Sequence, residues 1–198
     1  MECDKCPLGK RDPKIRRQAK FEHKLRFVMM CPPTDYVDIE GMEANTVRLL
    51  KRWVPDTPFD LVFVLNCTGG RFLRRSEEEH LPQIAKTFRE ASKCCSSTFK
   101  ADLEGAEVVV LMGNEVLSAM GIPKKVSALT GWVEEEKGVS YLATWDPHDV
   151  ESYPMDKWKD FIWTVQQAER IVNGEAPRSN VSLDLEWSDI RSVESFEQ

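Results

Sequence analysis

Short apolar runs alternate along the chain with segments whose apolar residues recur at helical spacing. The runs 25–31, 59–66 and 108–112 predict buried strands, because each is only a few residues long and ends in Pro, Gly or polar residues. Segment 42–53, between the first two runs, has the apolar spacing of an amphipathic helix that ends before Pro55. Strand, loop and helix therefore follow one another repeatedly, which is typical of a parallel α/β sheet.

Two helices are predicted between the second and third strands. Ser76 and Glu79 have the spacing of a capping box, so one helix is expected to start there. A second helix is expected over about 96–104. After the third strand, Gly113 leads into a short helix that ends at Met120.

The last part of the body predicts a hairpin and a closing helix. Segments 132–136 and 139–144 flank a Lys-Gly turn, and the second of them leads into loop 145–149. An amphipathic helix is expected over 155–172. The expected fold class is α/β, a three-layer α/β/α arrangement around a central, mainly parallel four-stranded sheet.

The length of 198 residues favours one domain, over 1–172, followed by an acidic C-terminal tail over 173–198. The chain has neither an apolar run of the roughly 20 residues that a membrane helix needs nor an apolar N-terminal signal. We therefore expect no membrane association and a location in the cytoplasm, or in the nucleus of a eukaryotic host.

Charge is distributed unevenly. The net charge of −6 argues against a nucleic-acid partner, but basic residues concentrate in 1–26 and acidic residues in the tail. The body without the tail is close to neutral and has a basic N-terminal face, which is compatible with phosphate contact. An ordinary solvated surface explains the same pattern about equally well.

Six cysteines stand in a chain without a secretory signal, where metal ligands are more common than disulfides. Cys3 and Cys6 are close enough to bind one metal centre, and Cys67 with Cys94 or Cys95 can supply the remaining ligands. Zinc and a [4Fe-4S] cluster fit such a set about equally. The alternative is that the last three cysteines are small buried apolar residues.

Several motifs follow one another in a recognisable order. They are Cys3-x-x-Cys6-Pro7-Leu8, a strand ending at Cys67 with Arg71 shortly after, Cys94-Cys95, the strand 108–112 with Gly113, and Asp146-Pro147. From Cys3 to about Arg170, this order resembles family 4 uracil-DNA glycosylases. The resemblance implies a [4Fe-4S] cluster, with zinc as the alternative. The implied ligands are Cys3, Cys6, Cys67 and Cys95, with Cys94 as the alternative to Cys95.

The first catalytic motif of that family is altered. Its acidic residue, which helps to place the attacking water, is replaced by Met30, whereas its proline is retained as Pro32. Asp35 is a candidate substitute for the acid, although turn formation is the more common role of such an aspartate.

The base pocket implied by the resemblance is altered as well. The family's stacking phenylalanine falls where this chain is shortened, which leaves Tyr36 as the aromatic candidate. The family's base-reading asparagine aligns near Phe63, and Asn66 takes its role only if it is displaced. Met30, Pro32, Tyr36 and Asn66 are the expected pocket residues.

The last motif, His-Pro-Ser in the family, is Asp146-Pro147-His148 here. The family's histidine stabilises negative charge that develops on the departing uracil, and an ionised Asp146 would repel that charge. Asp146 and His148, together with Asp35, are therefore expected to act on a base other than plain uracil. A loop without catalytic function explains the motif at least as well.

The resemblance also indicates a surface for the DNA backbone. The polar and basic residues in the corresponding loops are Arg71, Arg74, Arg75, Lys124, Lys125 and Ser127. Such contacts are independent of sequence, and the same residues also fit an ordinary surface.

Three functions are compatible with these patterns. The first, slightly favoured, is a divergent uracil-DNA-glycosylase-like DNA enzyme that acts on a flipped, modified base. The second is a catalytically inactive [4Fe-4S] DNA-binding protein that serves as an accessory to replication or repair proteins. The third, supported only by the acidic charge, is a zinc-bearing interaction module without a DNA role.

Overall fold

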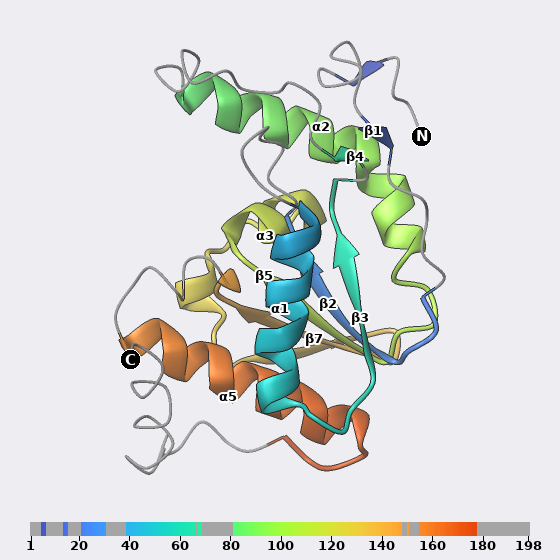
Figure 1. Ribbon diagram of the computed structural model, residues 1–198, viewed down its shortest axis with the longest axis vertical. Coiled ribbons are helices and arrows are strands. Elements are labelled where there is room, and N and C mark those ends of the chain that lie inside the picture. Colours follow the sequence, from blue (N-terminus) through green and yellow to red (C-terminus); the bar gives the residue numbers. More distant parts are fainter. Residues whose placement is uncertain are drawn as a thin grey trace.

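The computed structural model is a mixed α/β fold around one five-stranded sheet (Figure 1). It describes residues 5–6, 14–15, 21–30, 39–65, 67–68, 81–147, 150 and 155–177. The strands of this sheet are β2 (Leu25–Met29), β3 (Phe59–Phe63), β5 (Val108–Met112), β6 (Val133–Glu136) and β7 (Val139–Thr144). The helical elements are α1 (Ile39–Trp53), α2 (Leu81–Ala101), α3 (Asn114–Met120), the 3-10 turn η4 (Val126–Ala128) and α5 (Met155–Val172).

The sheet has the order β3-β2-β5-β7-β6. The first four strands of this order are parallel, and β6 pairs antiparallel with β7. The expected number of four strands was wrong, because the hairpin adds β6 as an edge strand to the parallel set. Lys137 and Gly138 close the hairpin with φ values of 53° and 79°, and two-residue turns with positive φ match the twist of paired strands.

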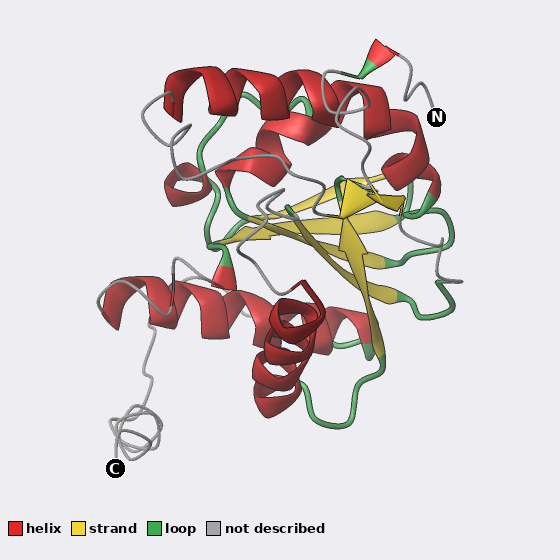
Figure 2. Cartoon of the chain, turned by 45° about the horizontal axis from the view of Figure 1, so that its top comes forward, coloured by secondary structure: helices red, strands yellow, loops and turns green. Residues whose placement is uncertain are grey.

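Helices cover both faces of the sheet (Figure 2). One core lies between the sheet and the helices α1 and α5, and it includes Phe27, Leu50 and Phe161. The core on the opposite face includes Val109, with Phe99 of α2 and Leu117 of α3. Because the central strands are buried on both faces, their sequences are continuous apolar runs. Among the described residues, no helix combines the length and the apolar character that crossing a bilayer requires.

Helix α2 is one continuous helix of 21 residues, so the prediction of a separate helix over 96–104 was wrong. Its interior contains no Gly, and its single Pro is the second residue, where a missing N–H costs no helical hydrogen bond. Ala91, Cys95 and Phe99 are buried at helical spacing along one face. The two adjacent cysteines therefore lie within a helix. Ser76 and Glu79 of the predicted capping box lie outside the described residues.

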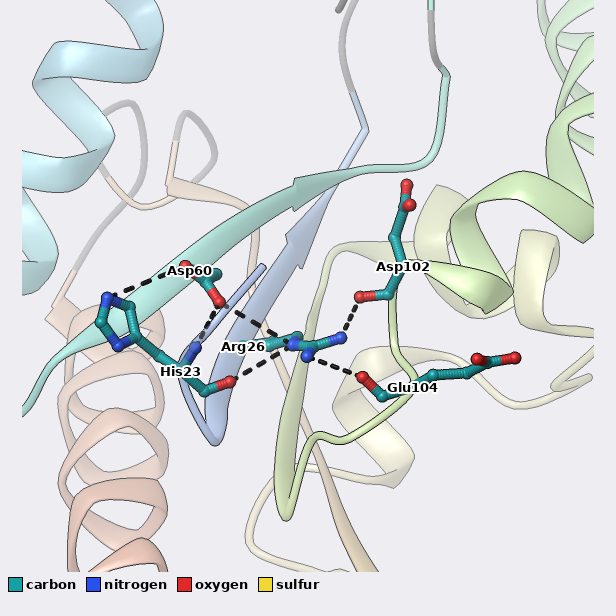
Figure 3. Close-up of polar contacts among 5 residues, drawn as sticks. All are labelled: His23, Arg26, Asp60, Asp102 and Glu104. Atoms are coloured by element: carbon teal, nitrogen blue, oxygen red, sulfur yellow. Dashed lines mark hydrogen bonds and ion pairs between the residues drawn. The ribbon is translucent and has the colours of Figure 1, made fainter. Parts of the chain in front are cut away.

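A buried arginine joins strands β2 and β3 to the turn after α2 (Figure 3). Arg26 is only 3% exposed, and its guanidinium donates to the backbone carbonyls of Asp102 and Glu104. Its Nε lies 3.9 Å from Oδ2 of Asp60, which also accepts a 2.8 Å hydrogen bond from the backbone N–H of His23. These contacts hold three segments together at the amino end of the strands.

Burial perturbs the ionisable groups of this network. Burial lowers the pKa of Arg26, and the nearby charges of Asp60 and Asp102 oppose that change. Burial raises the pKa of Asp102, and the charge of Arg26 opposes that change. An arginine stays protonated at neutral pH, so the fold holds a buried positive charge that depends on these acceptors.

We expect Arg26→Met to lower the free energy of unfolding by about 3 kcal/mol, because Asp60 and two partly buried carbonyls would lose a charged donor. Urea denaturation measures this change. Lys24→Met is the matched control, since the Lys24–Glu107 ion pair of 2.6 Å is exposed and should contribute less than about 1 kcal/mol. Equal losses in the two variants would contradict a structural role for Arg26.

Candidate functional site

The carboxyl ends of the parallel strands form one edge of the sheet, and open α/β sheets bind ligands at this edge. Met30 directly follows β2, Gly113 follows β5, and Asp146 lies just beyond β7. Strand β5 lies between β2 and β7, so these residues follow three neighbouring strands. The structure thus brings two of the predicted site residues, Met30 and Asp146, to one edge.

Two carboxylates flank Gly113 at this edge. A Cβ atom on Gly113 would lie 3.3 Å from Cβ of Asp146 and 3.6 Å from both Oδ2 of Asp146 and Oε2 of Glu115. Gly113 has φ 96° and ψ 158°, a conformation that glycine alone adopts easily, and its N–H donates to the carbonyl of Thr144 at 2.8 Å. Glu115 was not among the site residues predicted from the sequence. Its position, two residues after the glycine that ends a predicted strand, is the sequence feature that could have indicated it.

Asp146 also has a local structural role. The backbone N–H of Val150 donates to the carbonyl of Asp146 at 3.1 Å, which is the hydrogen bond of a helical turn. Asp is a favoured residue at a helix N-cap, and Pro is favoured at the next position, which Pro147 occupies. The Asp146-Pro147 pair is therefore explained by helix initiation without any catalytic step.

The loop before Asp146 is attached to the final helix. Nε1 of Trp145 donates to Oδ2 of Asp160 at 3.1 Å, and Nζ of Lys157 lies 4.5 Å from the centre of the Trp145 ring. Both partners belong to α5. These contacts fix the backbone from which Asp146 extends.

The predicted basic loop after α3 reaches the same edge. Lys124, Lys125 and Ser127 are exposed. A hydrogen bond fixes this loop to α3: the backbone N–H of Val126 donates to Oδ1 of Asn114 at 2.9 Å. Asn114 follows Gly113 directly, so the loop is held close to Asp146. Asn114 was not predicted as a site residue, because its contribution is a side-chain hydrogen bond to a residue 12 positions further along the chain.

Cysteines from distant parts of the chain gather on one side of the molecule. The small strand β1 (Lys14–Ile15) pairs with β4 (Cys67–Thr68), with Ile15 opposite Cys67. Both strands lie beside α2 (Figure 1). Cys6 and Cys95 are each 6% exposed and belong to the same apolar cluster, against which Cys94 packs.

The expected metal ligands are only partly described. Among the described residues, no group of three or more His, Cys, Asp or Glu residues could hold a metal ion. Cys3 and the side chain of Cys67 lie outside that part. The two buried cysteines that are described supply the soft sulfur donors that iron–sulfur clusters and zinc require.

Other predicted site residues also lie outside the described part of the chain. They are Pro32, Asp35, Tyr36, Asn66, Arg71, Arg74, Arg75 and His148. The expected catalytic role of His148 beside Asp146 therefore stays a prediction, as do the base pocket beyond Met30 and the arginine contacts to DNA.

Comparison of the chain with known protein families and with curated proteins finds no match.

Gly113→Ala should destabilise the fold by roughly 2–4 kcal/mol, since it adds backbone strain and a contact with Asp146. Gly138→Ala is the control, because Gly138 has φ +79° but has open space around its added Cβ. In the control, only the added backbone strain should lower the free energy of unfolding, by about 1 kcal/mol. Thermal denaturation compares the variants, and an equal loss would show that the contact with Asp146 does not matter.

Proposed function

We propose that the protein is a [4Fe-4S] DNA-binding protein with a divergent scaffold similar to that of uracil-DNA glycosylases. The pairing of β1 with β4 is the observation that carries this proposal. It draws the N-terminal segment, which contains the Cys3-x-x-Cys6 motif, toward the strand that begins with Cys67. Bringing together cysteines that are distant in sequence is what a metal centre with four thiolate ligands requires.

The proposed ligands are Cys3, Cys6, Cys67 and Cys95. Cys95 is the preferred fourth ligand because it lies on the buried face of α2, whereas Cys94 is half-buried. A bound cluster would tie the N-terminal segment to α2 and to the segment that follows β4. That segment contains Arg71, Arg74 and Arg75, so the metal centre would order a proposed DNA contact.

The second part of the proposal concerns the DNA surface. The exposed Lys124 and Lys125 project from a loop that Asn114 holds at the carboxyl edge of the sheet. Together with the three arginines after β4 they would contact phosphates without reading the base sequence. In this role the protein would act beside replication or repair proteins, in the cytoplasm or the nucleus.

A second candidate function is processing of a flipped, modified base. The observation in its favour is the placement of Asp146 and Glu115 on either side of Gly113, at the edge where α/β enzymes bind substrates. Asp146 with His148, assisted by Asp35, would then supply acid and base groups. We rank this function second because helix initiation already explains Asp146 and Pro147.

The metal proposal predicts that protein purified without oxygen contains about four iron atoms per chain and shows the broad visible absorbance of thiolate-bound iron. Cys95→Ala should remove most of the iron and the absorbance, whereas Cys94→Ala should retain them. Cys31→Ala, which changes a cysteine outside the proposed set, is the control. A colourless protein that contains zinc would overturn the cluster assignment.

The DNA proposal predicts that Lys124→Ala with Lys125→Ala weakens binding to DNA. Each lost phosphate contact should reduce the slope of log K against log salt by about 0.9. Fluorescence anisotropy with a labelled oligonucleotide at several salt concentrations measures both quantities. Lys137→Ala is the control, since Lys137 lies in the β6–β7 turn at the opposite edge of the sheet.

The same protein incubated with oligonucleotides that contain uracil or 5-substituted uracils separates the two functions. If the unaltered protein releases a base from these oligonucleotides and the variant Asp146→Asn does not, base processing becomes the favoured function. Binding without base release on any of these substrates supports the proposed binding function. Absence of salt-sensitive DNA binding would contradict both.

A further inference from the structure

Strand β3 forms an open edge of the sheet in the described part of the chain, where β2 is its only partner. The backbone N–H of Val64, just after β3, donates to the carbonyl of Met29 at 3.0 Å. In a parallel pair of strands, every second residue points its backbone N–H and C=O groups toward the same neighbouring strand. The backbone groups of Val62 and Asp60 therefore also point toward β2. Phe59 and Leu61 consequently direct their backbone groups away from β2, where another strand can pair with them.

A groove of about 690 Å³ runs along this edge. Phe59 and Leu61 line it from one face of β3, and Asp60 lines it from the other face. Since residues from both faces of one strand share the groove, it follows the strand's open side. Val47 of α1 and Phe21 extend the apolar lining on the two flanks.

The chain leaves helix α5 close to this groove. Oγ1 of Thr57, which lines the groove, donates to Oε1 of Glu169 in the last part of α5 at 2.8 Å. After Gly174, Glu175 turns back onto the helix and forms an ion pair of 2.8 Å with Arg170. The described chain ends at Pro177, three residues after this turn, and the rest of the acidic tail continues from there.

The tail contains a strand-like pattern within reach of this point. Apolar and polar residues alternate through Val181-Ser182-Leu183-Asp184-Leu185-Glu186-Trp187. Strict alternation over this length is typical of a strand with one apolar face. Each extended residue spans up to about 3.5 Å, so the few residues after Pro177 cover on the order of 10 Å.

The topology favours a parallel strand at this position. Helix α5 packs against β7, β5, β2 and α1, so it carries the chain across the sheet in the direction of β3. It lies on the same face as α1, which connects β2 to β3 in the same direction (Figure 2). A strand placed beyond β3 would therefore complete a crossover of the same hand as β2–α1–β3, and such crossovers share one hand almost without exception.

We propose that segment 181–187 pairs in parallel with β3 as a sixth strand of the sheet. Its apolar side chains would pack toward Val47, Phe59 and Leu61. The groove is lined by one lysine, Lys51, and by three carboxylates, those of Glu43, Asp56 and Asp60, so backbone pairing and apolar contact select the occupant rather than charge. The other edge strand, β6, has the sequence Val-Glu-Glu-Glu and therefore offers the apolar side chains of this segment little apolar contact.

Amide hydrogen exchange measured by NMR on the full-length protein tests this proposal. The N–H of Leu61 should exchange at least about tenfold more slowly in the unaltered chain than in the variant Leu183→Asp with Leu185→Asp. A chain that ends at Pro177 should show the same acceleration. The N–H of Val64, which donates to Met29, is the internal control and should exchange slowly throughout.

A matched variant, Asp184→Asn with Glu186→Gln, changes the polar face of the segment and should keep Leu61 protected. Equal exchange at Leu61 in all four proteins would overturn the proposal. Protection that increases with protein concentration would also overturn it, since a second copy would then supply the strand. Protection that is independent of concentration and lost only with the apolar residues is the expected result.

Discussion

The buried guanidinium of Arg26 is the interaction on which the arrangement of the sheet depends most. Removing a charge from water is costly, and Arg26 is stabilised because backbone carbonyls after α2 and the carboxylate of Asp60 surround it. The acceptors come from segments that the chain separates widely, so the charge is satisfied only when all of them are in place. A single polar side chain in this way makes the end of α2 and the start of two strands interdependent.

The consequences of that constraint reach the opposite end of the strands. Parallel pairing is continuous from β3 to β7, so a register set at the amino ends also sets where each strand ends. Gly113 and Asp146 lie close together because β5 and β7 end side by side. The amide side chain of Asn114 and the buried side chain of Val126 hold the candidate DNA loop there. Most of the contacts that position the side chains at the carboxyl ends of these strands therefore join residues that are distant in sequence.

Much of the architecture could be predicted from the sequence, because buried parallel strands such as 108–112 are apolar runs with clear ends. The continuity of α2 could not be predicted as easily, because the sequence was divided into a capped helix and a separate helix over about 96–104, whereas one helix joins them. The fifth strand was visible as half of a hairpin, but its place at the sheet edge depends on pairing with β7. Arg26 was unremarkable in sequence, because its partners are backbone atoms about 80 residues away. For the site, the motif order selected Asp146 and the basic loop, whereas Glu115 and Asn114 are positioned by tertiary contacts.

The pairing of β2 with β5 at the centre of the sheet also determines how the chain must fold. Leu25 lies opposite Val108, so this pair closes a loop of roughly 80 residues that includes α1, β3 and α2. Contacts of such long range form slowly, because the entropy lost in closing the loop is regained only when the strands pair. During synthesis, β2 emerges from the ribosome well before its central partner and has only β3 to pair with in the interval. The middle of the sheet is consequently completed late, and one backbone edge of β2 stays unpaired and open to other chains until β5 arrives.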